Sequence, residues 1–309
     1  MGKQFDRVYR LLVGVEGSDG IVIEGKPKEN ALNITFDIDK DLTKQTNKCR
    51  LQVFNLSDKT AKIFERDDSI CILEAGYSED IGLRRIFVGA VLKAWTSLKG
   101  ANMVTELELS DGQIAIRDCV VSLSYAASVS GRKVIEDVAA AMGLVVQFAE
   151  DLSYCSYANG FSYIGPGRTC LEKVCAASGL SWSIQNNVLQ IIEDGGSTKV
   201  IAIKLNADSG LIGSPERIIK AAKKIKKTSS KKSKKNKGKE KKAGWRVCSL
   251  LQPTLNPGDL IYLESKPVTG WFKIESLKHT GEYRGKKWHT NMEVYEIGGE
   301  DKKYRNSKS

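Results

Sequence analysis

The sequence lacks the patterns of membrane and secreted proteins, and it contains little histidine or proline. There are two histidines and six prolines in 309 residues. No stretch approaches the roughly 18 continuous apolar residues of a membrane-spanning helix. The first residues, MGKQFDRVYRLLVGVEG, alternate like a strand and lack the apolar centre and cleavage site of a signal peptide. We therefore expect a soluble protein that is not exported.

The cysteines exclude two kinds of small scaffold. There are seven, an odd number, and no two are spaced as C-x-x-C. They are Cys49, Cys71, Cys119, Cys155, Cys170, Cys175 and Cys248. Such a set indicates neither a disulfide framework nor a zinc knuckle. Most lie where a small apolar residue would also fit, so we interpret them as reduced, cytosolic and structural.

The positive charge of the chain is concentrated in one segment. Between Lys220 and Lys242 there are thirteen lysines and one acid, Glu240, which gives +12 and leaves −1 for the other residues out of a formal net charge of +11. The segment holds no arginine and no aromatic residue, whereas nucleic-acid-binding faces mix both with lysine. Repulsion between like charges and the lack of an apolar face predict a solvated loop, inserted at 220–243.

Contact between this segment and a polyanion, driven by counterion release, is the second interpretation. The lysines that would make the contact are Lys223, Lys224, Lys226, Lys227, Lys231, Lys232, Lys234 and Lys235. On this interpretation the protein is a basic nucleic-acid-binding β-barrel protein that acts through its lysine-rich loop.

Period-two alternation predicts β-rich regions at both ends of the chain. The first region has strand-like segments at 7–15, 31–38, 48–56, 69–77, 84–95 and 102–112, with a short helix at Lys59–Arg66. The last region has such segments at 198–206, 244–253, 270–281 and 286–297, which predict a four- or five-stranded antiparallel unit. Each region, at about 100 residues, has the size of a barrel or sandwich domain.

A duplicated helix–strand unit separates the two β-rich regions. GRKVIEDVAAAMGLVVQF, from Gly131, and GRTCLEKVCAASGLSWSI, from Gly167, match at eight of eighteen positions. Apolar residues recur at helical spacing in each copy, and Gly143 or Gly179 follows to end the helix in the left-handed conformation. The paired Arg132 and Arg168 could form an anion site, but solvation of the helix start with local pairing explains them without one.

Few residues suggest catalysis or metal binding. His279 and His289 fall in adjacent predicted strands and could face each other, yet no serine or cysteine motif supplies a nucleophile. The acids of DIDKD, at 37–41, imitate a calcium loop, but leucine and lysine stand where its glycine and bidentate acid belong. We place these acids on a solvent-facing strand edge, where charge discourages pairing with another strand. The sequence predicts no enzyme, cofactor or metal site.

Several segments resemble the baseplate central hub proteins of contractile-tailed bacteriophages and related prophages, the tail hub or phage late control D-like family. The segments are RIFVGAVLKAW, ELELSDG, SGLIGSPERI, SLLQPTLNPGDLIYLES and WFKIESLKHTGEYRGKKWHTNMEV. The resemblance covers nearly the whole chain and is most specific at Leu211–Glu216, Leu250–Ser265 and Lys273–Thr290. The lysine-rich segment departs from the family, which has a shorter and less charged link there.

The resemblance implies a mainly β fold in which two tail-tube-like β-barrels are joined by a small duplicated α/β module. We expect a first barrel at 1–112, the α/β module at 113–197, a second barrel at 198–297 and a polar tail at 298–309. It also implies a homotrimer whose six barrels form a ring that adapts a hexameric tail tube to a trimeric central spike and lines the DNA path.

The partners that follow from this resemblance are the spike protein, the tail tube or distal tube protein, the tape measure protein and the baseplate wedge proteins. Transient contact with phage DNA is a further expectation. The protein would be made in the host cytoplasm and reside in the virion tail baseplate.

Overall fold

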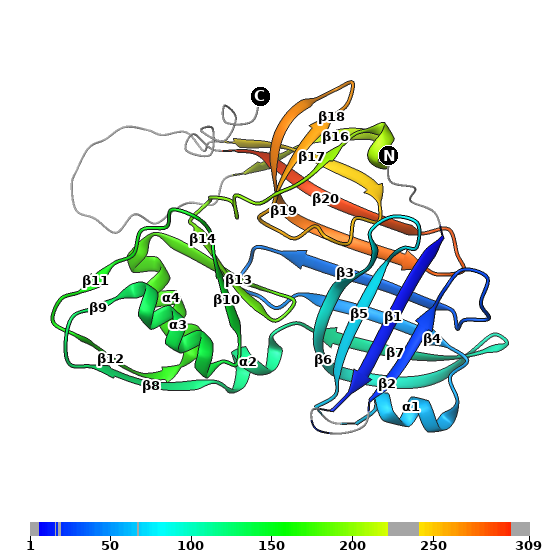
Figure 1. Ribbon diagram of the computed structural model, residues 1–309, viewed down its shortest axis with the longest axis horizontal. Helices are drawn as coiled ribbons and strands as arrows, with labels where there is room; N and C mark the ends of the chain where they lie inside the picture. Colours follow the sequence, from blue (N-terminus) through cyan, green and yellow to red (C-terminus); the bar gives the residue numbers. More distant parts are fainter. Residues whose placement is uncertain (1–5, 16, 18–19, 67, 222–240, 298–309) are drawn as a thin grey trace.

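The computed structural model describes residues 6–15, 17, 20–66, 68–221 and 241–297 of the chain. The fold is mainly β, as the sequence predicts, with four α-helices and one short 3₁₀ helix among the described residues. Figure 1 shows two groups of strands beside a separate group of helices and short strands. Within the described residues, no helix is both long enough and apolar enough to span a bilayer.

The first group, which we call unit 1, contains seven strands and one helix. The strands are β1 (Arg7–Gly14), β2 (Ile21–Gly25), β3 (Ile34–Asp41), β4 (Lys48–Phe54), β5 (Ile70–Tyr77), β6 (Gly82–Lys99) and β7 (Asn102–Ser110). Alternate residues such as Leu11, Leu51 and Leu73 are fully buried in one core, which explains the period-two pattern. The predicted helix forms as α1 (Asp58–Phe64), whose first turn is capped by the Ser57 side chain.

The middle module confirms the predicted duplication. Its helices are α2 (Gln113–Asp118), α3 (Gly131–Ala141) and α4 (Gly167–Ser178), and its strands are β8 (Val120–Tyr125), β9 (Val129–Ser130), β10 (Val145–Phe148), β11 (Ser156–Tyr157), β12 (Phe161–Pro166), β13 (Leu180–Gln185) and β14 (Val188–Glu193). Helices α3 and α4 pack on each other, and each is followed by a left-handed glycine, Gly143 at φ 68° and Gly179 at φ 67°. The strands after them, β10 and β13, flank β14 in one small sheet.

The last group, unit 2, has six strands, more than the sequence predicts. They are β15 (Ile201–Leu205), β16 (Leu211–Ala221), β17 (Lys241–Leu250), β18 (Leu260–Glu264), β19 (Thr269–Glu282) and β20 (Trp288–Glu296), with the 3₁₀ helix η1 (Ala207–Ser209) after β15. The expectation of a wholly antiparallel unit is wrong for one pair, because β15 and β18 run parallel. The chain between them is long enough to return in the same direction, since it includes the β16–β17 hairpin.

Units 1 and 2 repeat one strand order. In unit 1 the order is β3-β4-β7-β6-β5-β1-β2, and in unit 2 it is β16-β17-β20-β19-β18-β15, so the two orders agree over six strands and β2 is an addition to unit 1. The two units differ in one strand direction, because β1 runs antiparallel to β5 and β15 runs parallel to β18. Each unit has a hairpin, then a three-strand meander whose last strand pairs with the hairpin, and then the first strand of the unit on the far side. We therefore treat β3 and β16 as equivalent, and likewise β6 and β19.

Backbone irregularities fix this equivalence residue by residue. Strand β6 has a bulge between Val91 and Lys93, and β19 has one between Ile274 and Ser276. Next to the bulge, the Val91 N–H donates to the Ser69 carbonyl at 2.8 Å, and the Ile274 N–H donates to the Asp259 carbonyl at 2.9 Å. The same bonds thus occur at the same places in the two units.

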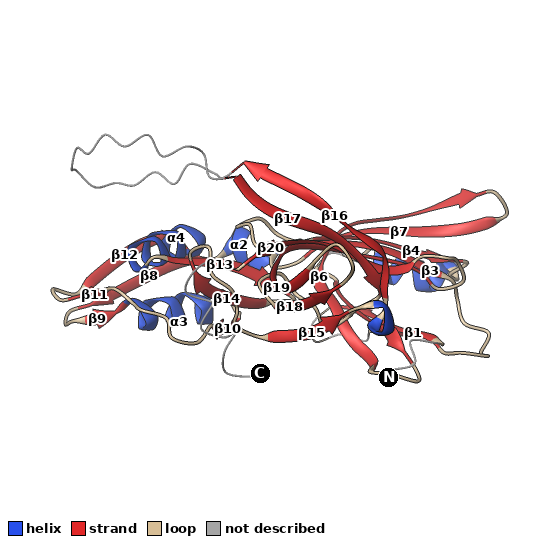
Figure 2. Cartoon of the chain, turned by 90° about the horizontal axis from the view of Figure 1, so that it is seen from above, coloured by secondary structure: helices blue, strands red, loops and turns tan. Residues whose placement is uncertain are grey.

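The two units belong to one continuous sheet of thirteen strands. Strand β3 of unit 1 pairs antiparallel with β19 of unit 2, so the blue and orange strands lie side by side in Figure 1. Two hairpins extend beyond the body. In Figure 2, β16–β17 projects on the side of the middle module and β6–β7 projects at the opposite end of the molecule.

Candidate assembly site

We call the pairing of β3 with β19 the seam. It is possible because β19 extends beyond the end of β18, its neighbour on the same edge. Strand β20 covers one edge of β19 along residues 272–281. On the other edge, β18 covers only residues 269–273, and β3 covers residues 276–282. Because β18 is short, the second half of β19 is left with unpaired backbone groups, and β3 supplies their partners.

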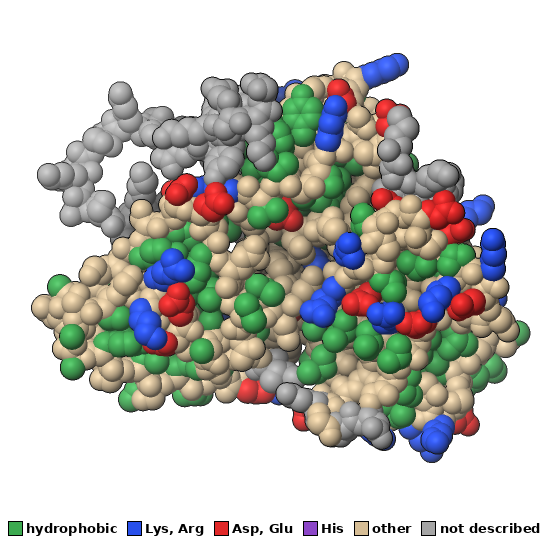
Figure 3. Space-filling view, viewed as in Figure 1, with side chains coloured by type: hydrophobic (Ala, Val, Ile, Leu, Met, Phe, Trp, Pro, Cys, Tyr) green, Lys and Arg blue, Asp and Glu red, His purple; other side chains and the backbone are tan. Residues whose placement is uncertain are grey.

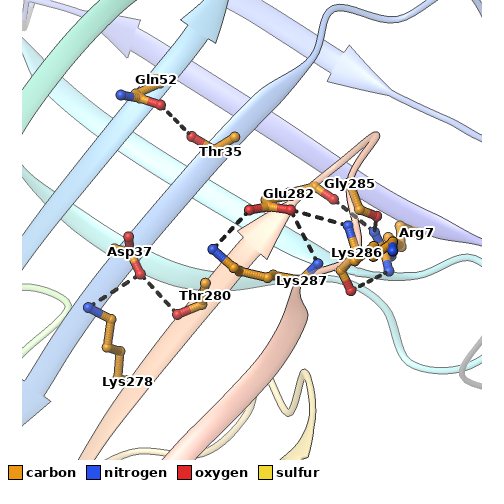
Figure 4. Close-up of polar contacts among 10 residues, drawn as sticks. All are labelled: Arg7, Thr35, Asp37, Gln52, Lys278, Thr280, Glu282, Gly285, Lys286 and Lys287. Atoms are coloured by element: carbon orange, nitrogen blue, oxygen red, sulfur yellow. Dashed lines mark hydrogen bonds and ion pairs between the residues drawn. The ribbon is translucent and has the colours of Figure 1, made fainter.

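Charged side chains cross the exposed side of the seam. The Lys278 ammonium lies 3.3 Å from the Asp37 carboxylate and 3.7 Å from that of Asp39. The Thr280 hydroxyl donates to Asp37 at 2.9 Å. Figure 4 shows the two contacts of Asp37, with Lys278 and with Thr280, beside the bond between Thr35 and Gln52. The expectation that the acids of 37–41 keep an edge unpaired is therefore wrong, since a lysine on the partner strand offsets their charge.

Aromatic rings close the buried side of the seam. Gly281 lies directly opposite Phe36 in the strand register, and a side-chain carbon at position 281 would meet the Phe36 ring at 2.2 Å. The Phe36 ring packs edge-on against Trp288, with 5.3 Å between centroids. The glycine is thus the only residue type that lets the ring cover the backbone at this position.

Arg7 of β1 holds the turn that follows β19. Its guanidinium donates to the carbonyl oxygens of Glu282 at 2.8 Å and Gly285 at 2.7 Å, as Figure 4 shows. It also lies over the Trp288 ring, 5.5 Å from the centroid. These bonds join residues more than 270 positions apart in the chain, so they attach the end of unit 2 to the start of unit 1.

A buried carboxylate joins unit 1 to the middle module. The Asp111 side chain is fully buried and accepts the backbone N–H of Asn186 at 2.6 Å and that of Asn187 at 2.9 Å. It also accepts from the Asn47 amide, which in turn donates to the Ile184 carbonyl at 2.8 Å. Burial raises the pKa of Asp111, and these hydrogen bonds lower it in part.

A second buried carboxylate joins unit 2 to the segment that leaves the middle module. Asp259 accepts the Thr198 hydroxyl at 2.9 Å and the Asn256 N–H at 2.9 Å. Burial raises the pKa of Asp259 to about 6. Burial also lowers the pKa of the Lys40 ammonium to about 8, and this amine donates to the Asn256 side chain at 3.3 Å. The carboxylates and the lysine thus fix the three parts of the chain against one another.

The sheet face that points away from the cores is polar and carries both signs of charge. Arg50 lies opposite Glu108 in unit 1, and Arg246 lies opposite Glu293 in unit 2. The second pair is an ion pair of 3.4 Å. Two shallow hollows on this face, one in each unit, are lined by these residues and by seam residues such as Asp39. Figure 3 likewise shows acidic and basic side chains interleaved over unit 1 on the face it presents.

Three solved structures resemble the whole of this fold. A tail protein from Neisseria meningitidis MC58 matches with a TM-score of 0.55 and 13% identity over 93% of this chain and 96% of that one. The 43 kDa tail protein of prophage MuSo2 from Shewanella oneidensis matches with a TM-score of 0.59 and 12% identity over 92% and 96%. The chain has a phage tail-protein fold.

An E. coli component of the type VI secretion system, described as structurally similar to T4 bacteriophage tail proteins gp27 and gp5, also has this tail-protein fold. It matches with a TM-score of 0.56 and 10% identity over 94% of this chain and 77% of that chain. No protein-family model and no curated protein sequence matches the chain.

Most residues that the sequence singles out are not part of the seam. The eight lysines from Lys223 to Lys235 lie outside the described residues, between the paired strands β16 and β17. Arg132 and Arg168 form helical ion pairs with Glu136 at 2.9 Å and Glu172 at 3.6 Å, as the local-pairing interpretation predicts. All seven cysteines are free thiols, and the described residues contain no group of three or more side chains suited to a metal.

The expectation that the two histidines could face each other is wrong. His279 lies opposite Thr290, and His289 lies opposite Thr280. Neighbouring residues of a strand point to opposite faces, so the two rings are on different sides of the sheet. His279 is fully buried and bonds to the Thr290 hydroxyl at 2.9 Å, and burial lowers the pKa of His279 well below its ordinary value.

Replacing the seam glycine tests how tightly Phe36 covers it. We expect Gly281→Ala to lower the free energy of unfolding by about 1–3 kcal/mol, because the new methyl group overlaps the Phe36 ring. In a Phe36→Leu background the same substitution should cost less, since the ring is gone. Urea denaturation of the four proteins measures both effects. Equal costs in the two backgrounds would contradict the contact.

The raised pKa of Asp259 predicts a pH-dependent stability. The Asp259 carboxyl binds its proton more tightly in the folded protein than in the unfolded chain. The stabilisation that comes from protonated Asp259 is therefore fully present below about pH 4 and is lost as pH rises through the folded pKa of about 6. Relative to the native protein, Asp259→Asn should therefore gain on the order of 2–3 kcal/mol in unfolding free energy between pH 4 and pH 7. Asp80→Asn, in an exposed turn, is the control, and a pH-independent difference for Asp259→Asn would contradict the assignment.

Proposed function

We propose that this chain is a structural subunit of a phage-type tail baseplate, and that three copies form a ring at the end of the tail tube. The observation that carries the proposal is the repeat of one strand order in two units of a single chain. Three such chains bring six similar units around a three-fold axis, which suits both a six-fold tube and a three-fold spike. The tail-protein fold supports the same role.

In this proposal the protein acts by geometry and affinity and performs no chemistry. The ring binds the tube protein on one side and the central spike on the other, with the tape measure and wedge proteins as further partners in the virion baseplate. We assign the polar face of the sheet to the channel, because a surface with both signs of charge lets DNA pass without holding it. Detachment of the spike would then open the path.

The mass of the protein in solution tests the ring. Size-exclusion chromatography with light scattering should give about three times the chain mass of 34.0 kDa for the chain alone, or that mass plus the mass of the spike trimer after a trimeric spike protein is added. A chain that remains a monomer with the spike present would contradict the proposal. A dimer would contradict it too, since two chains supply only four units.

The lysine-rich segment has a separate role in this proposal. Its residues stand between the two strands of a hairpin that projects from the body (Figure 2). Three copies would bring three segments of +12 each into one assembly, so an acidic surface must lie within about 8 Å to offset them. The spike face, the tape measure, passing DNA and lipid headgroups are the surfaces within reach of a baseplate ring.

Neutralising the eight lysines from Lys223 to Lys235 as glutamine tests this role. We expect the mass in light scattering to stay the same and the affinity for a DNA oligonucleotide at low salt to fall by at least an order of magnitude. The matched control neutralises eight exposed lysines elsewhere, namely Lys28, Lys44, Lys59, Lys62, Lys133, Lys173, Lys266 and Lys286. If the control loses as much affinity as the test variant, the segment is not the contact.

A further inference from the structure

The seam inside one chain joins two kinds of strand edge. It joins the outer edge of a hairpin strand, β3, to the second half of a long bulged strand, β19. The equivalent strands are β16, the hairpin strand of unit 2, and β6, the long bulged strand of unit 1. The chain uses β3 and β19 to join its two units, and it carries a second copy of each type of edge.

Both of those second edges are open among the described residues. Strand β16 ends the order of the thirteen-stranded sheet, so only β17 pairs with it. Strand β5 covers β6 up to Ala90. From Val91 to Lys99, β6 pairs with β7 alone, as the second half of β19 would pair with β20 alone if β3 were absent. Open edges of this length favour pairing with another strand.

Exposed apolar side chains mark the same two edges. Leu92 and Leu98 of β6 are 53% and 71% exposed, and Ile212 and Ile219 of β16 are 43% and 62% exposed. A single exposed leucine carries no information, but four on two unpaired edges indicate surfaces that are covered in an assembly. The hairpins that carry these edges project in opposite directions (Figure 2), so one copy of the chain cannot pair them with each other.

We propose that β16 of one chain pairs antiparallel with the second half of β6 in the next chain, and that this contact continues the sheet around the ring. The inference rests on the proposed ring and names the edges that close it. The contact is head-to-tail, because it joins two different surfaces, and such a contact repeats until the ring is complete.

The equivalence of the units also gives the register. Thr280 corresponds to Ser97, because each lies four residues after the end of its bulge. Asp37 corresponds to Glu216, because each lies opposite an arginine of the neighbouring hairpin strand. Those arginines are Arg50 in unit 1 and Arg246 in unit 2. Since Thr280 lies opposite Asp37 in the seam, Ser97 should lie opposite Glu216 of the neighbouring copy. The hydroxyl-to-carboxylate bond of the seam can thus form again between chains.

The same register places Trp95 opposite Ile218 of the neighbouring copy. Trp95 corresponds to Lys278, and Ile218 corresponds to Asp39. The seam uses an ion pair at this position, whereas the contact between chains would use an aromatic ring and a β-branched side chain, a favourable cross-strand pair. Trp95 and Ile218 are both half-buried in the single chain, so each has surface left for the neighbour.

A pair of cysteines tests the register. In a chain that carries both Ser97→Cys and Glu216→Cys, oxidation should yield disulfide-linked dimers and trimers on a non-reducing gel. Neither single variant should form them, and a mixture of the two single variants should stop at dimers. The pair Thr280→Cys and Asp37→Cys is the positive control, since the seam predicts a crosslink within one chain.

A charge substitution provides a second test that does not depend on disulfide geometry. Ile219→Asp should weaken association at least about tenfold while the melting temperature of the monomer stays within a few degrees, because the side chain is exposed in the single chain. Ile164→Asp, at an isoleucine of the middle module that is 78% exposed, should leave association unchanged.

The outcomes separate this inference from the proposed ring. The proposed edges are wrong, and the ring stands, under one combination of results. In that case light scattering shows trimers, the cysteines at 97 and 216 form no crosslink, and Ile219→Asp associates as fully as the native chain. Crosslinks in either single variant would overturn the head-to-tail contact. If the unmodified chain forms no trimer in any condition, both the ring and its edges are wrong.

Discussion

The unpaired backbone groups along a sheet edge are the constraint on which this structure depends. A strand that is longer than its neighbour leaves N–H and C=O groups without partners. In this chain β19 extends beyond β18, and β3 pairs with the part that β18 does not cover. That pairing makes one sheet of two units. The charged contacts of Lys278 and the packing of Phe36 on Gly281 then secure a register that the backbone bonds by themselves allow to slip.

The buried carboxylates have a different role from the exposed ion pairs. Exposed pairs such as Lys278 with Asp37 contribute little free energy, because solvent screens them. Asp111 and Asp259 instead satisfy backbone N–H groups in places that water does not reach. Loss of such an acceptor leaves those groups unpaired, so Asp111, and Asp259 through the Thr198 hydroxyl, stabilise the contacts between the middle module and the two units.

The sequence predicts the parts of this fold better than it predicts their arrangement. Period-two alternation identifies the strands, and the match between the copies at Gly131 and Gly167 identifies the duplicated helices, because both signals are local. The equivalence of β6 and β19 leaves no such signal in the sequence. It consists of bulges and backbone hydrogen bonds, which form equally well with different side chains. The seam joins Thr280 to Asp37, 243 residues apart, and nothing in DIDKD indicates a partner at that distance. The buried Asp111 could have been noticed, because an acid that ends an apolar strand, here before Gly112, often accepts bonds from a turn.

The most direct test of the account is a cryo-electron microscopy reconstruction of the assembled ring. We predict three chains around one axis, six β units at similar radius, and β16 of each chain beside β6 of the next in one unbroken sheet. A closed assembly of two chains, or a ring of three in which β16 and β6 both face solvent, would contradict the claim that one type of edge contact joins the units within and between chains.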